Sequence, residues 1–238
     1  MRYMRWLVIV LLAYAALFLL LPRYQTDILK AVIDSPKVHE SAFLSHWIDG
    51  MTRCQCDVPP CACKNGCSEQ RRIDWTSPYT ITAGVFSGTL AFMPFPPRHI
   101  VFLQSYAVAT SGADVPEMTE LCGPSRSPMS PQQVIAFAAL AMFAACLLNF
   151  ALGFLLGALI GSRRSGSGWV RSIDRWGLPM LGAGFLMPFG FPIGLACLYV
   201  GFRRSSFGGF LLTAGAGSIC HLVVLVTAFP HLATLFSG

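Results

Sequence analysis

The sequence predicts an all-α integral membrane protein, in which an N-terminal anchor helix precedes an inverted repeat of a re-entrant hairpin plus a transmembrane helix. Three observations predict this class. Of 238 residues, 54% are hydrophobic and only 12% are charged, and the mean hydropathy is +0.58, whereas about a quarter of the residues of a soluble domain are charged. The long charge-poor runs have a helical rather than an alternating pattern, which excludes an outer-membrane barrel. Prolines interrupt two of these runs near their middle.

The net charge of +6 would favour a nucleic-acid partner in a soluble protein. Here most of the basic excess lies beside apolar segments, as it does in the cytoplasmic loops of membrane proteins. We therefore predict membrane lipids, and other membrane-protein subunits, as partners and no nucleic acid. The predicted location is multi-pass in a bacterial inner membrane, and an organellar membrane stays open.

Residues 1–22 are predicted to form the anchor. The apolar run from Trp6 to Leu21 follows Arg2 and Arg5, an arrangement shared by signal peptides and signal anchors. No small-x-small cleavage site follows, because Pro22-Arg23-Tyr24 stands there, so we favour an anchor. Basic residues before the run keep the N-terminus inside, and the chain then emerges outside.

Residues 23–78 are predicted to form an extramembrane subdomain with equal numbers of acids and bases. Its apolar residues between Ile28 and Ile48 recur at near-helical spacing, interrupted at Asp34-Ser35-Pro36, and this predicts an amphipathic helix or helix pair. Because no basic face stands out, we expect this helix to pack on its own subdomain rather than on the membrane surface.

This subdomain contains a cluster of five cysteines, C-x-C-x4-C-x-C-x3-C, and a sixth cysteine follows in the next outer loop. An oxidising outer compartment and a small subdomain favour three disulfides, for which fifteen pairings exist. A thiolate site for Zn or Cu(I) is the alternative, although C-x-C differs from the usual C-x2-C zinc spacing. No cofactor is predicted. The predicted disulfide residues are Cys54, Cys56, Cys61, Cys63, Cys67 and Cys122.

Residues 79–161 are predicted to form the first hairpin and its transmembrane helix. The apolar stretch from Tyr79 to Thr110 is interrupted by three prolines between Phe92 and His99, and prolines in this density stop a helix. The shorter limb reaches only about 15–20 Å at 1.5 Å per residue, about half of a hydrocarbon layer. The uninterrupted run from Gln132 to Ile160 is long enough to span, with small residues for helix contact.

Residues 162–176 are predicted to be a cytoplasmic arginine-rich loop, and residues 177–238 the second hairpin and helix. Gly177 to Tyr199 is broken between Met187 and Pro192, and Phe207 to Leu235 is the last span. If the broken segment crossed the membrane, the four-arginine loop and the Arg203-Arg204 pair would lie on opposite sides. A hairpin keeps all six arginines inside, as the charge rule requires.

The same reasoning makes Tyr79 to Thr110 a hairpin, because a crossing would put the acidic loop from Asp114 to Glu120 inside. The first hairpin then enters from outside and the second from inside. The breaks are also alike in sequence, since Phe92-Met93-Pro94-Phe95-x-Pro97 matches Leu186-Met187-Pro188-Phe189-x-x-Pro192. Both observations predict an inverted repeat.

Arg175-Trp176-Gly177, Gly184 to Pro188, Gly201, Phe207 to Phe210 and Gly215-Ala216-Gly217 are similar in order and spacing to the second hairpin and following helix of the DedA/VTT (SNARE-associated) superfamily. The resemblance covers about Tyr79 to Phe236. It implies two oppositely inserted hairpins that meet near the midplane, and movement of lipids or isoprenoid-phosphate carriers across the membrane. The chain departs from the family where a carboxylate follows the first-hairpin proline and arginines flank the second. These positions hold Arg98, Phe185 and Phe191.

The arginine and histidine just after the first break are the most informative polar pair. An arginine inside an apolar segment is costly unless it meets water, an anion or a partner, and a phosphate headgroup would suit it, with N–H donors from the open helix ends. The alternative is a shallow hairpin whose arginine only anchors at the headgroups. The predicted substrate-binding residues are Arg98, His99, Pro94, Pro97, Pro188 and Pro192.

Other polar residues at membrane depth are expected to hold helices together. His221 either relays a proton, binds a headgroup or bonds a neighbouring helix, and we favour the last role. Gln104, Ser105 and Asn149 are expected to make interhelical hydrogen bonds. The three cysteines in apolar segments are expected to be packing residues: Cys146, Cys197 and Cys220.

Neither a phosphate-binding glycine loop nor a Ser-His-Asp set is present in the sequence, so we predict a protein that is not an enzyme. The predicted function is translocation of a lipid or isoprenoid-phosphate at a midplane site formed by the two hairpins. The alternatives are a non-catalytic structural or assembly subunit, whose disulfide-stapled outer domain contacts a partner, and an outer-face thiol or metal protein.

Overall fold

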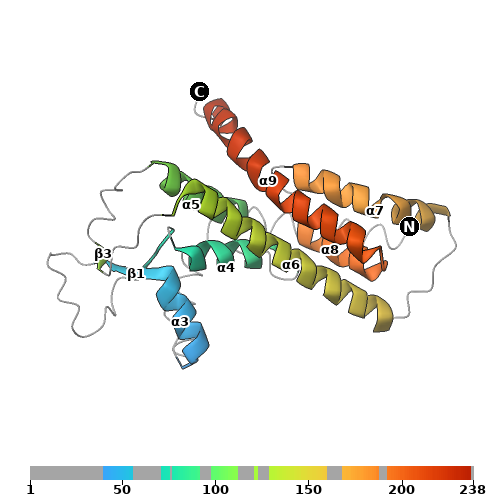
Figure 1. Ribbon diagram of the computed structural model, residues 1–238, viewed down its shortest axis with the longest axis horizontal. Helices are drawn as coiled ribbons and strands as arrows, with labels where there is room; N and C mark the ends of the chain where they lie inside the picture. Colours follow the sequence, from blue (N-terminus) through green and yellow to red (C-terminus); the bar gives the residue numbers. More distant parts are fainter. Residues whose placement is uncertain are drawn as a thin grey trace.

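The computed structural model describes residues 40–55, 71–75, 77–91, 98–111, 121–122, 129–159, 168–187 and 192–236. These residues form seven helices and a small sheet (Figure 1), so the predicted helical fold is confirmed and the sheet is an addition. The anchor at 1–22 and most of the predicted Ile28–Ile48 helix lie outside the described residues. The elements are α3 (Ala42–Met51), β1 (Thr52–Gln55), β2 (Arg71–Ile73), α4 (Pro78–Thr89), α5 (Arg98–Ser111), β3 (Leu121–Cys122), α6 (Pro131–Leu159), α7 (Gly168–Leu186), α8 (Ile193–Phe202) and α9 (Phe207–Phe236).

The sheet has the order β2-β1-β3, and both neighbours run antiparallel to β1. Strand β2 precedes α4 closely in the chain, and β3 follows α5. Both ends of the α4–α5 segment are therefore connected to strands that pair with β1. In Figure 1, α4 begins and α5 ends toward the left of the view, where the sheet lies.

The end of α3 is fixed to the start of α4. The last carbonyl groups of a helix lack partners within it, and here Ser77 Oγ donates to the Gly50 carbonyl and Thr80 Oγ1 to that of Met51. The Trp47 and Tyr79 rings meet edge to face at 5.2 Å. This contact joins α3 and the sheet that follows it to the helical bundle.

Helices α4 and α5 pack against each other on either side of the predicted break. Ser77 caps the start of α4 by accepting from the Tyr79 N–H, and Pro78 occupies the first turn, where its missing N–H has no cost. At Leu90 the backbone becomes extended, with φ −65° and ψ 138°, and the next helix begins at Arg98. The break therefore lies where the prolines predict it.

Helices α7 and α8 form the second broken segment and also contact each other. In Figure 1, α7 begins and α8 ends toward the right of the view, opposite to the ends of α4 and α5. The predicted loop over 162–176 is wrong for residues 168–176, because α7 begins at Gly168. The prediction began the helix where the apolar residues begin, at Gly177. The arginine-containing residues before it continue the helix, because arginine has a high helix propensity.

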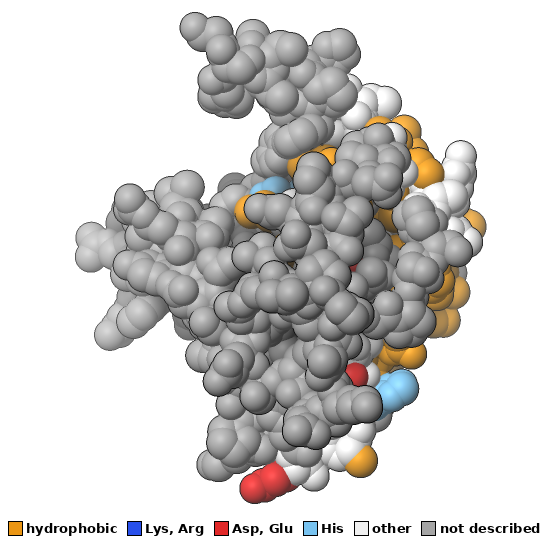
Figure 2. Space-filling model, turned by 90° about the vertical axis from the view of Figure 1, so that its left-hand side faces the viewer, with side chains coloured by type: hydrophobic (Ala, Val, Ile, Leu, Met, Phe, Trp, Pro, Cys, Tyr) orange, Lys and Arg blue, Asp and Glu red, His pale blue; other side chains and the backbone are white. Residues whose placement is uncertain are grey.

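Two of the described helices are long and apolar enough to cross a membrane, namely α6 with 29 residues and the part of α9 from Phe207 to Ala228. At 1.5 Å per residue the shorter of these spans about 33 Å, which matches a hydrocarbon core of about 30 Å. Large apolar side chains on both helices are exposed, among them Leu140, Leu159 and Leu212 at 65%, 82% and 77%. The end-on view of Figure 2 likewise shows a hydrophobic right-hand surface on the part that is not grey.

Helices α6 and α8 make the most extensive interhelical contact of the described residues. It is a seam of glycines against backbone, where the two helices approach too closely for a side chain. A Cβ at Gly157 would lie 2.5 Å from the Phe202 carbonyl oxygen, and Cβ atoms at Gly153 and Gly201 would lie even closer to the carbonyl oxygens of Leu198 and Phe150. This is the close backbone approach that small residues permit between membrane helices.

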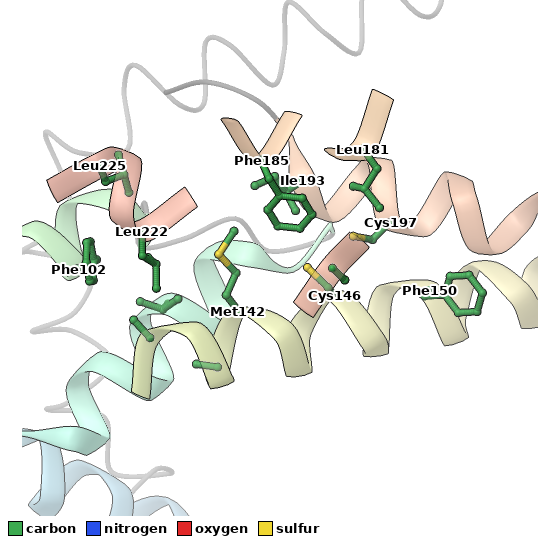
Figure 3. Close-up of a cluster of buried hydrophobic side chains, with 14 of the residues drawn as sticks. Phe102, Met142, Cys146, Phe150, Leu181, Phe185, Ile193, Cys197, Leu222 and Leu225 are labelled. Carbon is green, nitrogen blue, oxygen red and sulfur yellow. The ribbon is translucent and has the colours of Figure 1, made fainter. Parts of the chain in front are cut away.

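The buried core extends along α6 from Val134 to Phe150, where it borders this seam (Figure 3). Phe150 of α6 stacks on Phe210 of α9 with ring centroids 4.2 Å apart. Cys146 and Cys197 are fully buried, lie within hydrogen-bonding reach of each other and direct their sulfur atoms toward one another across the α6–α8 contact. The packing role predicted for these two cysteines is confirmed. For Cys220 it is wrong, because this residue is exposed on α9.

Candidate functional site

The end of α4 is held by one buried side chain of α6. Asn149 is fully buried, its Nδ2 donates to the Thr89 carbonyl at 3.1 Å, and its Oδ1 accepts from the Ala91 N–H at 3.0 Å. One amide thus satisfies two main-chain groups where the helix stops, groups that would be costly to bury without partners. The predicted interhelical role of Asn149 is confirmed.

The same turn, residues 89–91, which we call the first tip, also meets the start of α8. Gly194 lies so close that a Cβ there would overlap the Thr89 carbonyl oxygen and come within 2.8 Å of the Ala91 nitrogen. The first tip is therefore enclosed between Asn149 of α6 and Gly194 of α8. The end of α4 therefore lies against the start of α8.

The end of α7, residues 185–187, which we call the second tip, is held in a similar way by α9. His221 is 1% exposed, and its Nδ1 lies 2.9 Å from the Phe185 carbonyl oxygen. Because a carbonyl oxygen only accepts, Nδ1 carries the proton that it donates. The role favoured for His221, a bond to a neighbouring helix, is confirmed. Next to it, Gly217 lets the Phe185 ring lie directly on the α9 backbone.

The two tips are held at positions that the repeated Met-Pro-Phe motif makes equivalent. When Met93 is aligned with Met187, Ala91 corresponds to Phe185. Asn149 contacts the first of these residues and His221 the second, each from the long helix that follows its own broken segment. Asn149 both donates to and accepts from the end of α4, whereas His221 donates to the end of α7.

The first turn of α5 brings two more nitrogen-bearing side chains to this region. Arg98 and His99 lie close enough to His221 to act on it electrostatically, and Arg98 also acts on Cys197 of α8. We call Arg98, His99 and His221 the central cluster. Its members come from the start of α5 and from α9, two helices that are in contact.

The charge of the central cluster is positive, and the one acid on the helices around it is Asp174 of α7, eleven residues before Phe185. The sequence has no Asp or Glu on α4, α5, α6, α8 or α9. His221 Nε2 is buried without a hydrogen-bond partner, although an imidazole nitrogen can both donate and accept depending on its protonation. Because Nδ1 carries the proton of the neutral ring, Nε2 of His221 is an acceptor and becomes a donor only when the ring takes up a second proton. The Arg98 guanidinium is the group of the cluster that suits an anion, because guanidinium binds phosphate through two parallel hydrogen bonds.

Several predicted site residues cannot be placed in this cluster. Pro94, Pro97 and Pro188 lie outside the described residues, whereas Pro192 is half-buried at the start of α8. Cys56, Cys61, Cys63 and Cys67 also lie outside them. Among the described residues, no group of three His, Cys, Asp or Glu side chains could hold a metal ion.

Two expectations for α5 are wrong. Gln104 is exposed, so its amide is not between described helices, and the buried Ser105 Oγ has no hydrogen-bond partner. The convergence of His221 with Arg98 and His99 was missed. Its only sequence signal is that each is an ionisable side chain in an apolar segment, which marks a functional candidate without showing which candidates meet.

Comparisons of the chain with protein-family models, with curated protein sequences and with solved structures found no match.

Proposed function

We propose that this protein is a multi-pass membrane protein that translocates a lipid or an isoprenoid-phosphate, and that the anionic phosphate of this molecule passes through the central cluster. The observation that carries the proposal is that Arg98 and His99, at the start of α5, lie within electrostatic reach of the buried His221 of α9, a helix that α5 contacts. A positive site at the ends of interrupted helices is how many transporters receive anionic substrates.

Helix lengths support the re-entrant topology. Helices α4, α5 and α8 contain 12, 14 and 10 residues, which correspond to about 18, 21 and 15 Å, and none reaches across a hydrocarbon core of about 30 Å. The apolar part of α7, Gly177–Leu186, is equally short. The α4–α5 segment also begins and ends beside one sheet. Each broken segment therefore returns to the side from which it entered, and α6 and α9 cross.

The opposite directions of the two broken segments support an inverted repeat, and the equivalent contacts of Asn149 and His221 with the two tips support it further. We propose that the chain is a divergent relative of the DedA/VTT superfamily, in a bacterial inner or an organellar membrane. The exposed apolar faces of α6 and α9 would contact the acyl chains.

The chemistry of the cluster defines the expected transport. Helices α4, α5, α6, α8 and α9 carry no carboxylate, and Asp174 of α7 precedes the second tip by eleven residues. A carboxylate-based proton-coupled cycle therefore has no residue to use at the cluster. We therefore propose passive exchange of lipid between leaflets, driven by the lipid gradient. Phosphate offers two oxygens to a guanidinium and can also accept from imidazole.

Reconstitution tests the proposal. Liposomes that contain the purified protein and labelled phosphatidylglycerol, phosphatidic acid or polyprenyl phosphate are assayed for movement of label between leaflets, and empty liposomes give the background. We expect faster movement with protein, and a loss of about tenfold in Arg98→Gln, which corresponds to about 1.4 kcal/mol. Movement no faster than in empty liposomes for all three lipids would reject the proposal.

A matched control is available in the exposed Arg204, at the turn between α8 and α9, which lies over the Phe154 ring at 5.3 Å. Arg204→Gln removes the same charge away from the central cluster and should leave the rate unchanged. Equal losses in both variants would show that overall charge, not the cluster, sets the rate.

The interlocked seam favours a second function, that of a structural or assembly subunit. Glycine-to-backbone contacts at Gly153, Gly157 and Gly201 join α6 and α8 rigidly, as expected for a scaffold that holds a partner on its outer domain. Gentle extraction followed by sizing separates the two functions. A stable larger complex that moves no lipid supports the subunit, whereas a monomer or small homo-oligomer that moves lipid excludes it.

A further inference from the structure

The sheet brings together two cysteines that are far apart in the sequence. Strands β1 and β3 pair antiparallel, with Cys54 opposite Cys122 and Gln55 opposite Leu121. Directly opposite residues of an antiparallel pair have Cα atoms about 4.5 or 5.5 Å apart, depending on their place in the ladder. A disulfide requires a Cα separation of about 4.4–6.8 Å. The backbone pairing thus satisfies this requirement in either case.

The register also selects this pair against its neighbours. A shift by one residue would place Cys54 opposite a non-cysteine, and a shift by two would place Cys56 rather than Cys54 opposite Cys122, so the observed register favours Cys54 as the partner. The six cysteines from Cys54 to Cys122 allow fifteen complete pairings. When one pair is fixed, the remaining four cysteines can pair in only three ways. The structure therefore narrows a choice that the spacing left open.

We propose that Cys54 and Cys122 form a disulfide between β1 and β3. The bond rests on the proposed topology in one respect, because that topology places the sheet in the oxidising outer compartment. Each thiol loses its proton, the two sulfurs join, and two electrons pass by thiol–disulfide exchange to a protein disulfide donor, whose own disulfide is reduced to two thiols.

The bond would close the open end of the first broken segment covalently. Strand β3 follows α5, so the disulfide ties the far end of α5 to β1. Strand β2, which leads into α4, is paired with the other edge of β1. Both ends of the α4–α5 segment would then be attached to one strand, which keeps its limbs together on the outer side.

Peptide mapping of the full-length protein tests this pairing. The protein, purified from membranes without reductant, is denatured, treated with N-ethylmaleimide to block free thiols and cleaved after arginine and before aspartate. These cuts fall after Arg53 and before Asp57, and before Asp114 and after Arg126. The expected product is fragment 54–56 linked to fragment 114–126, together with fragment 57–71 where Cys56 is also paired, and a reductant separates the fragments.

Fragment 54–56 also contains Cys56, and single variants resolve the two cysteines. In Cys56→Ser the linked product should persist, and in Cys54→Ser it should disappear, with Cys122 then carrying the maleimide. The wild-type map gives the assignment to this fragment even where a variant is not recovered.

Three results would overturn the proposal. They are Cys122 blocked by maleimide in the wild type, Cys122 linked to a fragment other than 54–56, and a link that persists in Cys54→Ser. Zinc or copper released on denaturation together with a blocked Cys122 would assign the thiols to a metal instead. The map is independent of lipid movement, so the pairing can fail while the transport proposal stands, and the reverse.

Discussion

The glycine seam between α6 and α8 predicts that a Gly→Ala substitution lowers the free energy of unfolding at the seam and raises it at an exposed position. In Gly153→Ala, the new Cβ would overlap the Leu198 carbonyl oxygen and lie 2.9 Å from both the Leu198 carbonyl carbon and the Phe202 nitrogen. All three are main-chain atoms inside α8, so no side-chain rotation relieves the contact and the helices must separate. Forced overpacking costs about 1–3 kcal/mol or more, and alanine returns only about 1 kcal/mol of helix propensity.

We therefore expect Gly153→Ala to lower the free energy of unfolding by about 2 kcal/mol. For a protein of this size that corresponds to a fall in the thermal midpoint of about 4–8 °C. Gly157→Ala should cost less, because its Cβ would meet only the Phe202 main chain, with the nearest atom at 2.5 Å. Unfolding of the detergent-solubilised protein, followed by circular dichroism, measures all of these changes.

Gly208 supplies the control, since nothing lies within 4 Å of a Cβ at this exposed position near the start of α9. Gly208→Ala should raise the free energy of unfolding by about 0.5–1 kcal/mol through helix propensity alone. If Gly153→Ala were as stable as Gly208→Ala, the close approach of α8 to Gly153 would be refuted, because the added methyl group would then meet nothing at either position.

Two further predictions concern buried polar groups and the core thiols. Asn149→Leu leaves the Thr89 carbonyl and the Ala91 N–H buried without their partner, and should lower the free energy of unfolding by about 1–3 kcal/mol in the same measurement. The control Gln104→Leu, at an exposed position, should change this free energy by less than about 0.5 kcal/mol. Equal effects would contradict the hydrogen bonds of Asn149. A membrane-permeant oxidant, molecular iodine, should link Cys146 to Cys197, with two iodide ions and two protons released, and peptide mapping that finds both still free after oxidation would contradict the α6–α8 packing.

The sequence predicts the helical breaks and the long helices because both depend on local chemistry. Proline prevents a helix wherever it stands in this density, and an apolar run of sufficient length is already evident in the order of residues. The same local reading failed at Gly168, where a charged run continues a helix, and at the sheet. Strands of two to four residues carry too few positions for an alternating pattern to be detected.

The candidate site could be predicted only in part, for a related reason. Arg98 and His99 are identifiable because a charge beside a break in an apolar segment is costly. The partner of Asn149 is not, because its hydrogen bonds join residues 58 and 60 positions apart. Likewise, the glycines of α6 indicate that another helix can approach closely, but the sequence does not show that this helix is α8.

The contacts also indicate where the proposed path of the lipid lies. Helix α6 belongs to the first half of the chain and α8 to the second, and the glycine seam between them leaves no space for a headgroup. By contrast, α5 contacts α9 over a much smaller surface, and the central cluster is formed by residues of these two helices. A headgroup that reaches Arg98 must therefore part α5 from α9 rather than α6 from α8. It follows that Gly153→Ala should reduce stability more than it reduces the rate of lipid movement per folded molecule, whereas Arg98→Gln should do the opposite.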